Sequence, residues 1–499
     1  MHRGCPRLKS ARKCVNTMSI PRALVYILRI APLRVRERYG TIRFGRLTNK
    51  EISMKFDRKI YNRLLDWKQS RNGKTALLIE GARRVGKSFI VEEFAKREYK
   101  SHVTIDFSSP QPLTLAAILH EPHDLDGLFN IISLEYQTRL IPGQSLIVFD
   151  EVQLCPQARQ MIKHLVADGR YYYIETGSLI TLKTQMEDIL IPSEEERVAM
   201  YPMDFEEFCW AMGDTVTVDF ARRCFDGRKP LGPLNDTIMK RYCEYLCVGG
   251  MPQAVAAYAA SRDLSAADLA KRDILKLYRD DISKFAKGNA AKVRRIFDEI
   301  PGQLSKKEKK YSLASLQKSA RMREYEDAFA WLADAKVVNP CYNATDPTVG
   351  MSLSSDFATQ KLYMADTGLL MSHALGEESM TSGELYKAIF TGDVYFNCGM
   401  VAENAVAQCL VASGRSLFFY SRRNPESHRS ELEVDFLIRR NGMISPIEVK
   451  SGRYQSHASL DKFSVKFADR IGERFVLYTK DVMEKDGIVH LPIYMAMFL

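Results

Sequence analysis

The chain has 499 residues, of which 46% are hydrophobic, 27% charged and 10% aromatic. These proportions exclude collagenous, coiled-coil and wholly disordered chains, and the length predicts about three domains because one hydrophobic core would be too large. The ten cysteines contain no Cys-x-x-Cys pair, which indicates reduced thiols in a cytoplasmic protein and disfavours a disulfide framework or a zinc ribbon.

The formal net charge of +11 comes from the N-terminal segment. Residues 1–50 contain 13 Lys and Arg and one Glu, so the rest of the chain sums to −1 and any basic surface there is local. We expect residues 1–53 to be a basic, disordered tail or the product of a start codon assigned too early. Their apolar stretch at 23–28 is far below the roughly 20 residues of a bilayer span, and no later run is longer, so no membrane segment is predicted.

Residues 54–202 show short apolar strands that alternate with helical patterns. Strands are predicted at 75–81, 102–107, 145–151 and 171–178, with helical patterns at 56–67, 86–97, 125–140 and 157–167. This alternation is typical of an α/β fold in which helices cover both faces of a parallel sheet.

The rest of the chain divides into three predicted parts. Helical periodicity dominates residues 203–300, which we interpret as a helical lid. Residues 301–380 contain two helical patterns followed by a strand, an order that resembles a winged helix. Residues 381–499 are predicted as a helix at 394–412, strands at 416–420, 432–439 and 443–450, then a further helix and strand.

A phosphate-binding loop is the strongest motif. The segment fits G-x-x-x-x-G-K-[ST] and lies between an apolar strand and a helix, which disfavours a chance glycine-rich turn. Its backbone N–H groups and the helix N-terminus would bind the phosphates of ATP, Lys87 would reach the β- and γ-phosphates, and Ser88 would bind Mg²⁺. The loop consists of Gly81, Ala82, Arg83, Arg84, Val85, Gly86, Lys87 and Ser88.

Two later strand ends carry the residues that such a loop requires. Asp150 ends the run LIVFD and would orient the Mg²⁺ shell, and Glu151 would polarise the attacking water. Thr176 and Ser178 end the strand at 171–178 and are predicted to reach the water or the γ-phosphate. The alternative is a set of polar residues at solvated strand ends.

A hairpin near the C-terminus predicts a second site. Asn441-Gly442 between two alternating runs favours a two-residue type I′ turn, which places Asp435 opposite Glu448 and Glu433 opposite Lys450. Opposed carboxylates about 5 Å apart repel unless a cation lies between them, so Asp435 and Glu448 are predicted to bind Mg²⁺, with Lys450 as a catalytic residue. The alternative is an exposed hairpin face. The opposite face is predicted to hold Val434, Phe436, Ile438, Ile447 and Val449.

These motifs resemble a family of prokaryotic ATPases of the AAA class that carry a C-terminal domain of unknown function. The resemblance extends over about residues 56–485 and implies ATP binding and hydrolysis. Besides the P-loop and LIVFDEVQ, it rests on TGS, YPMDFEEF (201–208), VGGMPQAV (248–255), KLYMADTGLL (361–370), EVDFLI and PIEVKSG.

The last part resembles the PD-(D/E)XK restriction-endonuclease fold, in which a helical acidic residue joins the strand Asp and the Glu-x-Lys. Glu403 matches that helical position, and the resemblance implies a catalytic role for it. Val434 replaces the Pro of the nominal motif, and Glu196-Arg197 replaces the Gly-Arg usual in the family, which disfavours Arg197 as an arginine finger. Nuclease activity is implied only by relatives of the fold.

The leading interpretation is an Mg²⁺-dependent ATPase that couples its nucleotide state to a nuclease-like domain. One alternative is a nucleic-acid-binding regulator, in which a winged helix around Ser315–Asp334 binds DNA through a local basic patch. Another is a protein-interaction switch without nuclease activity. The sequence leaves the oligomeric state open. The predicted basic patch consists of Lys306, Lys307, Lys309, Lys310, Arg321 and Arg323.

Overall fold

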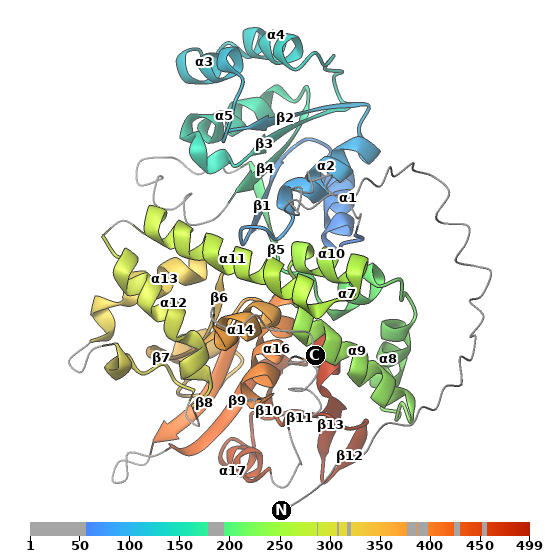
Figure 1. The fold of residues 1–499 in the computed structure, drawn as a ribbon, viewed down its shortest axis with the longest axis vertical. Coiled ribbons are helices and arrows are strands. Elements are labelled where there is room, and N and C mark those ends of the chain that lie inside the picture. The colour runs from blue at the N-terminus through green and yellow to red at the C-terminus, as the bar shows by residue number, and fades with distance from the viewer. Residues whose placement is uncertain are drawn as a thin grey trace, which may run out of the picture. The chain divides into compact units, whose positions relative to one another are not determined.

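The computed structural model describes most of the chain from residue 56 to the C-terminus (Figure 1). The described residues are 56–177, 194–286, 288–306, 309–316, 321–376, 386, 398–423, 430–451 and 457–499. All of them belong to the unit Met54–Leu499. The predicted basic tail, Ser178 and Lys307 lie outside the described residues.

The first part of the chain forms a five-stranded parallel sheet with the strand order β2-β3-β4-β1-β5. Its strands are β1 (Ala76–Gly81), β2 (Ser101–Asp106), β3 (Ser145–Asp150), β4 (Tyr172–Gly177) and β5 (Glu195–Met200). Four of these were predicted, and β5 was not.

Both faces of this sheet are covered, as predicted (Figure 1). Ala76 and Leu78 of β1 pack into one hydrophobic cluster with α3, α4 and α5. Leu77 and Ile79, which point the other way, pack into a second cluster with α1 and α2. The helices are α1 (Ile60–Arg71), α2 (Lys87–Glu98), α3 (Pro112–His120), α4 (Leu125–Glu135) and α5 (Pro156–Asp168), and a 3₁₀ turn, η2, spans Val152–Leu154.

The predicted helical lid is helical. It consists of α7 (Phe205–Ala211), α8 (Thr217–Asp226), α9 (Leu234–Val248), α10 (Pro252–Ser261), α11 (Leu264–Phe285) and α12 (Ala290–Leu304). The 22 residues of α11 make a helix about 33 Å long at 1.5 Å per residue. It is the longest helix among those described and is seen from the side, across the centre of Figure 1.

The remaining strands form one eight-stranded sheet in the order β12-β13-β11-β10-β9-β8-β6-β7. They are β6 (Val338–Ala344), β7 (Ser355–Met364), β8 (Leu417–Arg423), β9 (Ser430–Arg440), β10 (Met443–Val449), β11 (Arg474–Tyr478), β12 (Met483–Lys485) and β13 (Ile488–Pro492). The accompanying helices are α13 (Glu326–Asp334), α14 (Thr367–Leu375), α16 (Cys398–Ala412) and α17 (Ala458–Lys466), with 3₁₀ turns at Leu313–Ser315, Met322–Glu324, Met351–Ser354 and Ile493–Phe498.

The segment predicted as a winged helix is part of this sheet. Its strand β6 pairs with β7 on one side and runs parallel to β8 on the other. One hydrophobic cluster runs from Met203 to Leu499 and includes residues of the helical region, of β6 and β7, and of the C-terminal strands. The boundaries predicted at residues 300 and 380 therefore fall within one core.

Three glycines allow two chain segments of this core to cross at backbone distance. Gly249 adopts φ +80°, and a Cβ atom added there would lie 2.4 Å from Asp366 Oδ1. A Cβ on Gly368 would lie 2.5 Å from the Cα of Gly249, and one on Gly250 would lie 2.1 Å from the carbonyl oxygen of Met203. Asp366 Oδ2 accepts the N–H of Gly250 at 2.6 Å. The VGGMP and MADTG segments thus meet at one crossing, which leaves no room for a side chain at any of the three glycine positions.

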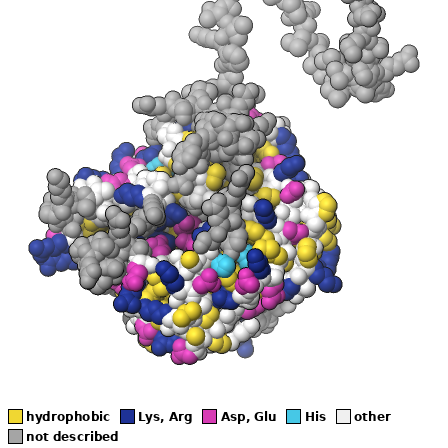
Figure 2. All heavy atoms as spheres, turned by 90° about the horizontal axis from the view of Figure 1, so that it is seen from below, with side chains coloured by type: hydrophobic (Ala, Val, Ile, Leu, Met, Phe, Trp, Pro, Cys, Tyr) yellow, Lys and Arg dark blue, Asp and Glu magenta, His cyan; other side chains and the backbone are white. Residues whose placement is uncertain are grey.

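The surface is of mixed charge on the face drawn in Figure 2, where basic and acidic side chains are interspersed. Within the described ranges, no helix combines the length and the apolar character that a membrane crossing requires.

Candidate functional site

The P-loop follows β1 and adopts a conformation that depends on its glycines. A Cβ on Gly81 would lie 2.4 Å from the carbonyl oxygen of Met200, and Gly86, with φ +98°, immediately precedes α2. Lys87 is buried, and its Nζ donates to the carbonyl oxygens of Gly81 (2.9 Å) and Ala82 (3.1 Å). Burial lowers the pKa of Lys87, and the nearby carboxylates of Glu151 and Asp150 oppose that shift. The lysine is therefore held by its own loop.

The predicted Mg²⁺ ligands meet at the ends of β3 and α2. Ser88 Oγ donates to Asp150 Oδ1 at 2.9 Å, and the hydroxyl of Thr176 donates to the same oxygen. Asp106 ends β2 directly beside Asp150 in the parallel register. A hydroxyl next to two carboxylates is the hard oxygen set that Mg²⁺ prefers, so these residues fit that ion. Asp106 was not predicted as a site residue, although the strand that carries it was; its signal was an acidic residue at the end of that strand.

Glu151 is held in an unusual backbone conformation. Its φ is +52°, a value that non-glycine residues seldom adopt and that is often found at functional sites. Its carboxylate accepts from the side-chain amide of Gln153, which is buried, and its N–H donates to the hydroxyl of Thr176 (3.4 Å). Gln153 was not predicted as a site residue. The sequence signal for Gln153 was its position at the end of LIVFDEVQ, two residues after Glu151.

Lys87, Asp106, Asp150, Glu151 and Gln153 line one pocket of about 370 Å³. The five-stranded sheet and the P-loop provide one wall, and α11, α13 and the segment between α13 and β6 provide the other. From the sheet side the pocket is lined by Arg83, Lys87, Asp106, Ser108, Asp150, Glu151, Gln153 and Leu154; from the other side by Tyr278, Asp281, Ile282, Lys284, Phe285, Trp331, Ala335 and Val337.

Helix α11 binds the P-loop directly. The carboxylate of Asp281 accepts from Arg83 at 2.5 Å, and the hydroxyl of Tyr278 donates to the carbonyl oxygen of Arg83 at 3.1 Å. Burial raises the pKa of Asp281, and the Arg83 guanidinium opposes this shift. Arg84 is exposed and has φ +67°.

Arg197 does not line this pocket. It lies on β5, where it pairs with Glu195 (2.8 Å) and approaches Glu80 (3.8 Å). Glu195 also binds Arg159 of α5 at 2.6 Å, and Arg159 binds Glu175 of β4 at 3.1 Å. The contacts among Arg159, Glu175 and Glu195 are buried, and exposed Arg197 joins them through Glu195, which gives Arg197 a structural environment.

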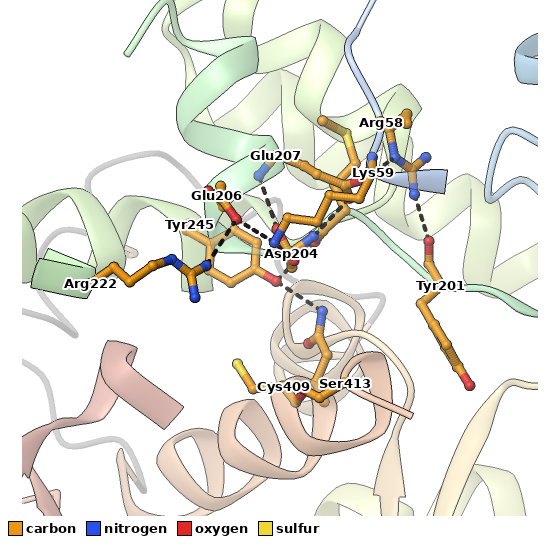
Figure 3. A network of polar contacts seen from close by, with 12 residues as sticks. Arg58, Lys59, Tyr201, Asp204, Glu206, Glu207, Arg222, Tyr245, Cys409 and Ser413 are labelled. Carbon is orange, nitrogen blue, oxygen red and sulfur yellow. Dashed lines mark hydrogen bonds and ion pairs between the residues drawn. The ribbon is translucent and has the colours of Figure 1, made fainter. Parts of the chain in front are cut away.

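A second network anchors the loop from the opposite side (Figure 3). Arg58 donates to the carbonyl oxygens of Val85 (3.1 Å) and Tyr201 (2.7 Å), and its Nε lies 3.1 Å from Glu207. Glu207 and Asp204 form the capping box of α7. The YPMDFEEF segment thus holds the P-loop.

The same network extends to the C-terminal region. Tyr245 donates to the carbonyl oxygen of Met203 at 2.9 Å and accepts from Gln408 of α16 at 3.0 Å (Figure 3). Asn404, one turn before Gln408, bonds to the backbone of Met364 through both ends of its amide. Helix α16, which carries Glu403, is therefore fixed through its own side chains to Tyr245 of α9 and to the backbone of Met364 in β7.

The predicted hairpin register is confirmed. Pairing runs from Arg440–Met443 to Phe436–Ile447, and Asn441 and Gly442 both have positive φ, at 50° and 76°, as a type I′ turn requires. Beyond that point the N–H of Val449 donates to Asp435 Oδ2 at 2.9 Å.

The prediction that Val434 shares a face with Phe436 was wrong. Val434 packs with Tyr420 and Leu432 in a separate hydrophobic cluster. The register between β8 and β9 shifts between Phe418 and Tyr420, and one extra residue reverses the side-chain alternation of a strand.

The structure brings the predicted C-terminal residues together and adds cations that were not predicted among them. The carboxylate of Glu403 binds Lys309 and accepts from the hydroxyl of Tyr363 at 3.2 Å. Lys361, which is fully buried, lies 2.9 Å from Glu433 and 3.8 Å from Asp435. We call Glu403, Glu433, Asp435 and Glu448, with Lys309, Lys361 and Lys450, the acidic cluster.

Burial shapes the charge of the acidic cluster. It raises the pKa of Glu403, and it raises that of Glu448 to about 7, with the Asp435 carboxylate adding to the effect and Lys450, 2.6 Å away, opposing it. For Lys361, burial lowers the pKa, but the Glu433, Glu403 and Asp435 carboxylates outweigh it and the net shift is upward.

The acidic cluster retains one free acceptor that a cation would suit. Glu448 Oε2 is buried and has no hydrogen-bond partner in the structure. Among the described residues, no three His, Cys, Asp or Glu side chains already have the spacing of a metal site. The carboxylates therefore fit a divalent cation by their chemistry, and rearrangement would be needed to bind it.

The predicted basic patch is divided. Lys309 contacts the acidic cluster and Lys310 is buried, whereas Lys306, Arg321 and Arg323 are exposed. Lys309 and Lys310 are therefore not part of a solvated basic surface, because neighbouring protein groups cover them.

Three family models match parts of the chain. Residues 73–209 match an AAA domain, residues 239–381 a domain of unknown function (DUF8612), and residues 398–495 another domain of unknown function (DUF4143). None of the curated proteins compared with the chain matches it.

Solved structures align with low scores. The Walker-type ATPase PABY2304 of Pyrococcus abyssi aligns over 64% of this chain and 96% of its own, at 15% identity and a TM-score of 0.37. The ORC1 protein of Aeropyrum pernix in complex with DNA aligns over 65% and 93%, at 12% identity and 0.27. Drosophila ORC bound to DNA aligns over 67% and 95%, at 11% identity and 0.25. TM-scores this low do not establish a shared fold. The family match and the P-loop geometry together identify residues 73–209 as a P-loop domain of the AAA class.

Proposed function

We propose that the chain is an Mg²⁺-dependent ATPase. The observation that carries the proposal is the meeting of Lys87, Asp150 and Glu151 in one pocket, with the hydroxyl of Ser88 bound to Asp150. ATP phosphates would draw Lys87 from the two carbonyl oxygens that now hold it, and Ser88 and Asp150 would hold the ion. Bound Mg²⁺ would supply charge neutralisation of the phosphates.

Glu151 would accept a proton from the attacking water, and Gln153 would hold its carboxylate in place. Arg83 and Lys284 line the same pocket and would add positive charge near the phosphates. Because both belong to this chain, cations for the site do not depend on Arg197.

The test is phosphate release from ATP at varied Mg²⁺ concentrations, with and without duplex DNA. We expect Lys87→Ala to lose nucleotide binding, and Glu151→Gln to keep binding but lose turnover by about 10²–10⁴-fold, the range for a general base. Wild-type hydrolysis by both variants would refute the proposal. Stimulation by DNA would support the nucleic-acid-binding alternative, for which exposed Lys306, Arg321 and Arg323 are the remaining candidates in the described part of the chain.

We propose further that α11 carries the nucleotide state to the C-terminal region. Beyond its contacts with Arg83, α11 binds α12 through Arg279 and Asp298 (3.0 Å) and approaches α14 through Asp268, which accepts from Ser372 at 2.6 Å. One rigid helix thus contacts both the P-loop and the shared core.

Asp281→Asn tests this coupling. Removal of the carboxylate frees Arg83 and removes a negative charge from the pocket, so we expect ATP to bind about three- to tenfold more tightly, in keeping with a partly exposed ion pair of roughly 1 kcal/mol. Asp280→Asn, on the exposed face of the same helix, is the matched control. Weaker ATP binding by Asp281→Asn alone would show that the ion pair positions Arg83 and does not compete with ATP.

A nuclease activity is the second candidate function. The convergence of Glu403, Asp435, Glu448 and Lys450 favours it. We expect divalent-dependent cleavage of DNA that is lost in Lys450→Ala. If wild-type protein gives no cleavage with Mg²⁺ or Mn²⁺, the nuclease proposal is to be abandoned.

We propose that the protein acts in the cytoplasm, since the eight cysteines in the described part of the chain are free and six of them are buried.

A further inference from the structure

Three lysine side chains already offset most of the charge of the four carboxylates in the acidic cluster. Lysine amines contact each of its carboxylates: Lys309 binds Glu403, Lys361 binds Glu433 and lies near Asp435, and Lys450 binds Glu448. Buried charges are stable only when paired, so these amines fill the place that the sequence assigned to a metal ion. A divalent cation would have to compete with at least one of them.

The three lysines differ in how readily they can leave. Lys361 is fully buried in β7, where residues on either side of it pair with β6, so its withdrawal would break the sheet. Lys450 belongs to the Glu-x-Lys motif and follows β10 directly. Lys309 lies outside any helix or strand, and its side chain is 14% exposed. Lys450 is more exposed, at 31%, but its backbone N–H donates to the carbonyl oxygen of Leu477 in β11 at 2.8 Å, which fixes its backbone. Lys309 is therefore the cation whose whole residue can move without the loss of a strand contact.

Glu403 would not tolerate the loss of Lys309 without a replacement. Its side chain is only 7% exposed, and its other oxygen already accepts from Tyr363. The free Oε2 of Glu448 and the carboxylate of Asp435 are the other oxygen ligands in the acidic cluster. Without the Lys309 amine, the carboxylates of Glu403, Asp435 and Glu448 carry the negative charge that a divalent cation requires.

We propose that Lys309 and a divalent cation compete for Glu403, so that the acidic cluster binds metal only after Lys309 has left. This inference rests on the metal site proposed above. Lys309, which lies after α12 and binds Glu403 of α16, would then regulate metal binding at that site.

The test is isothermal titration of the full chain with Mn²⁺, without nucleotide and in an Asp150→Asn background that removes the P-loop ligand. We expect Lys309→Met to bind Mn²⁺ at least about tenfold more tightly than the parent, because a lost pair in a mostly buried site is worth more than the roughly 1 kcal/mol of an exposed one. Lys306→Met is the matched control, since Lys306 is exposed and its amine donates to the side chain of Gln303 at 2.9 Å rather than to a carboxylate of the acidic cluster. Addition of Asp435→Asn should abolish the gain.

Two further measurements keep the result interpretable. Lys309→Gln retains a donor to Glu403 without the charge, so it replaces Lys309→Met if thermal melts show that the latter is unfolded. Because coupling between two ligands is reciprocal, saturating Mn²⁺ should also speed amide exchange at Tyr311, whose N–H donates to the carbonyl oxygen of Gln360 at 2.8 Å.

The outcomes separate the two proposals. Asp435-dependent Mn²⁺ binding of equal strength in the parent, Lys309→Met and Lys306→Met would overturn the competition and leave the metal site standing. Absence of Asp435-dependent binding in every folded variant would overturn the metal site, and the competition with it.

Discussion

Individual residues of the nucleotide pocket were predictable where a motif fixes their spacing. Lys87, Ser88, Asp150 and Glu151 could be assigned because a loop and two strand ends bring fixed sequence positions to one edge of a parallel sheet. Gln153 and Asp106 could not, because no motif marks them: the first contacts Glu151 within the turn after β3, and the second lies beside Asp150 only through the strand order. Asp281 could not either, because it reaches the P-loop from α11. Lys361 is the clearest case, since nothing in the sequence marks a lysine that lies fully buried among carboxylates.

Glu175 provides a pH test at the residue scale. Burial raises its pKa from 4.5 to about 8, with the Arg159 guanidinium opposing the shift. The folded state therefore binds a proton that the unfolded state releases, so stability should fall as pH rises from about 4.5 to about 8, with a slope of up to about 1.4 kcal/mol per pH unit.

We expect Glu175→Gln to remove this contribution, because Gln does not titrate and Arg159 keeps its contact with Glu195. Urea unfolding at pH 5 and pH 8 measures it. The variant should gain stability relative to wild type at pH 8 compared with pH 5. An equal difference at both values would show that Glu175 titrates normally.

At the scale of elements, periodicity predicted the buried strands and the helices well. Strand β5 was missed because it contains Glu195, Glu196 and Arg197, and its charge is compatible with a strand only because ion pairs with other elements compensate it. The hairpin register was predicted correctly because the turn alone fixes it. The face of Val434 was not, since a bulge between β8 and β9 leaves no local signal.

The glycine crossing makes a stability prediction for two elements. Gly250→Ala places a Cβ 2.1 Å from the backbone oxygen of Met203, which cannot move away easily in the core. We therefore expect the free energy of unfolding to fall by about 1–3 kcal/mol or more, the usual cost of overpacking a core. Gly302→Ala is the matched control. It lies within α12 with open space around it, and Ala there should stabilise by roughly 0.5–1 kcal/mol. Denaturant midpoints of both variants measure the difference, and tolerance of Gly250→Ala would mean that the crossing is loose.

At the scale of the whole molecule, strand composition predicted a sheet but not which distant strands share it. β6 and β7 precede β8 by more than fifty residues, and the pairing of β6 with β8, which brings β7 into the same sheet, is determined by packing across that interval. An α/β P-loop domain was therefore predictable from local order, whereas the fusion of the following segments into one core was not.

The eight-stranded sheet also determines how the chain can be divided. The family match at residues 398–495 begins after β6 and β7, so a fragment cut there would expose the backbone of β8 as an unpaired edge and would lack both Lys309 and Lys361. Unpaired edges recruit other strands, and carboxylates without their lysines repel.

We expect a fragment of residues 398–499 to aggregate, and one of residues 203–499 to remain monodisperse, in size-exclusion chromatography at equal concentration. A monodisperse short fragment would contradict this. If the short fragment aggregates, the family match at residues 398–495 begins inside the smallest segment able to fold. The strands that complete its sheet, β6 and β7, would have to be synthesised with it.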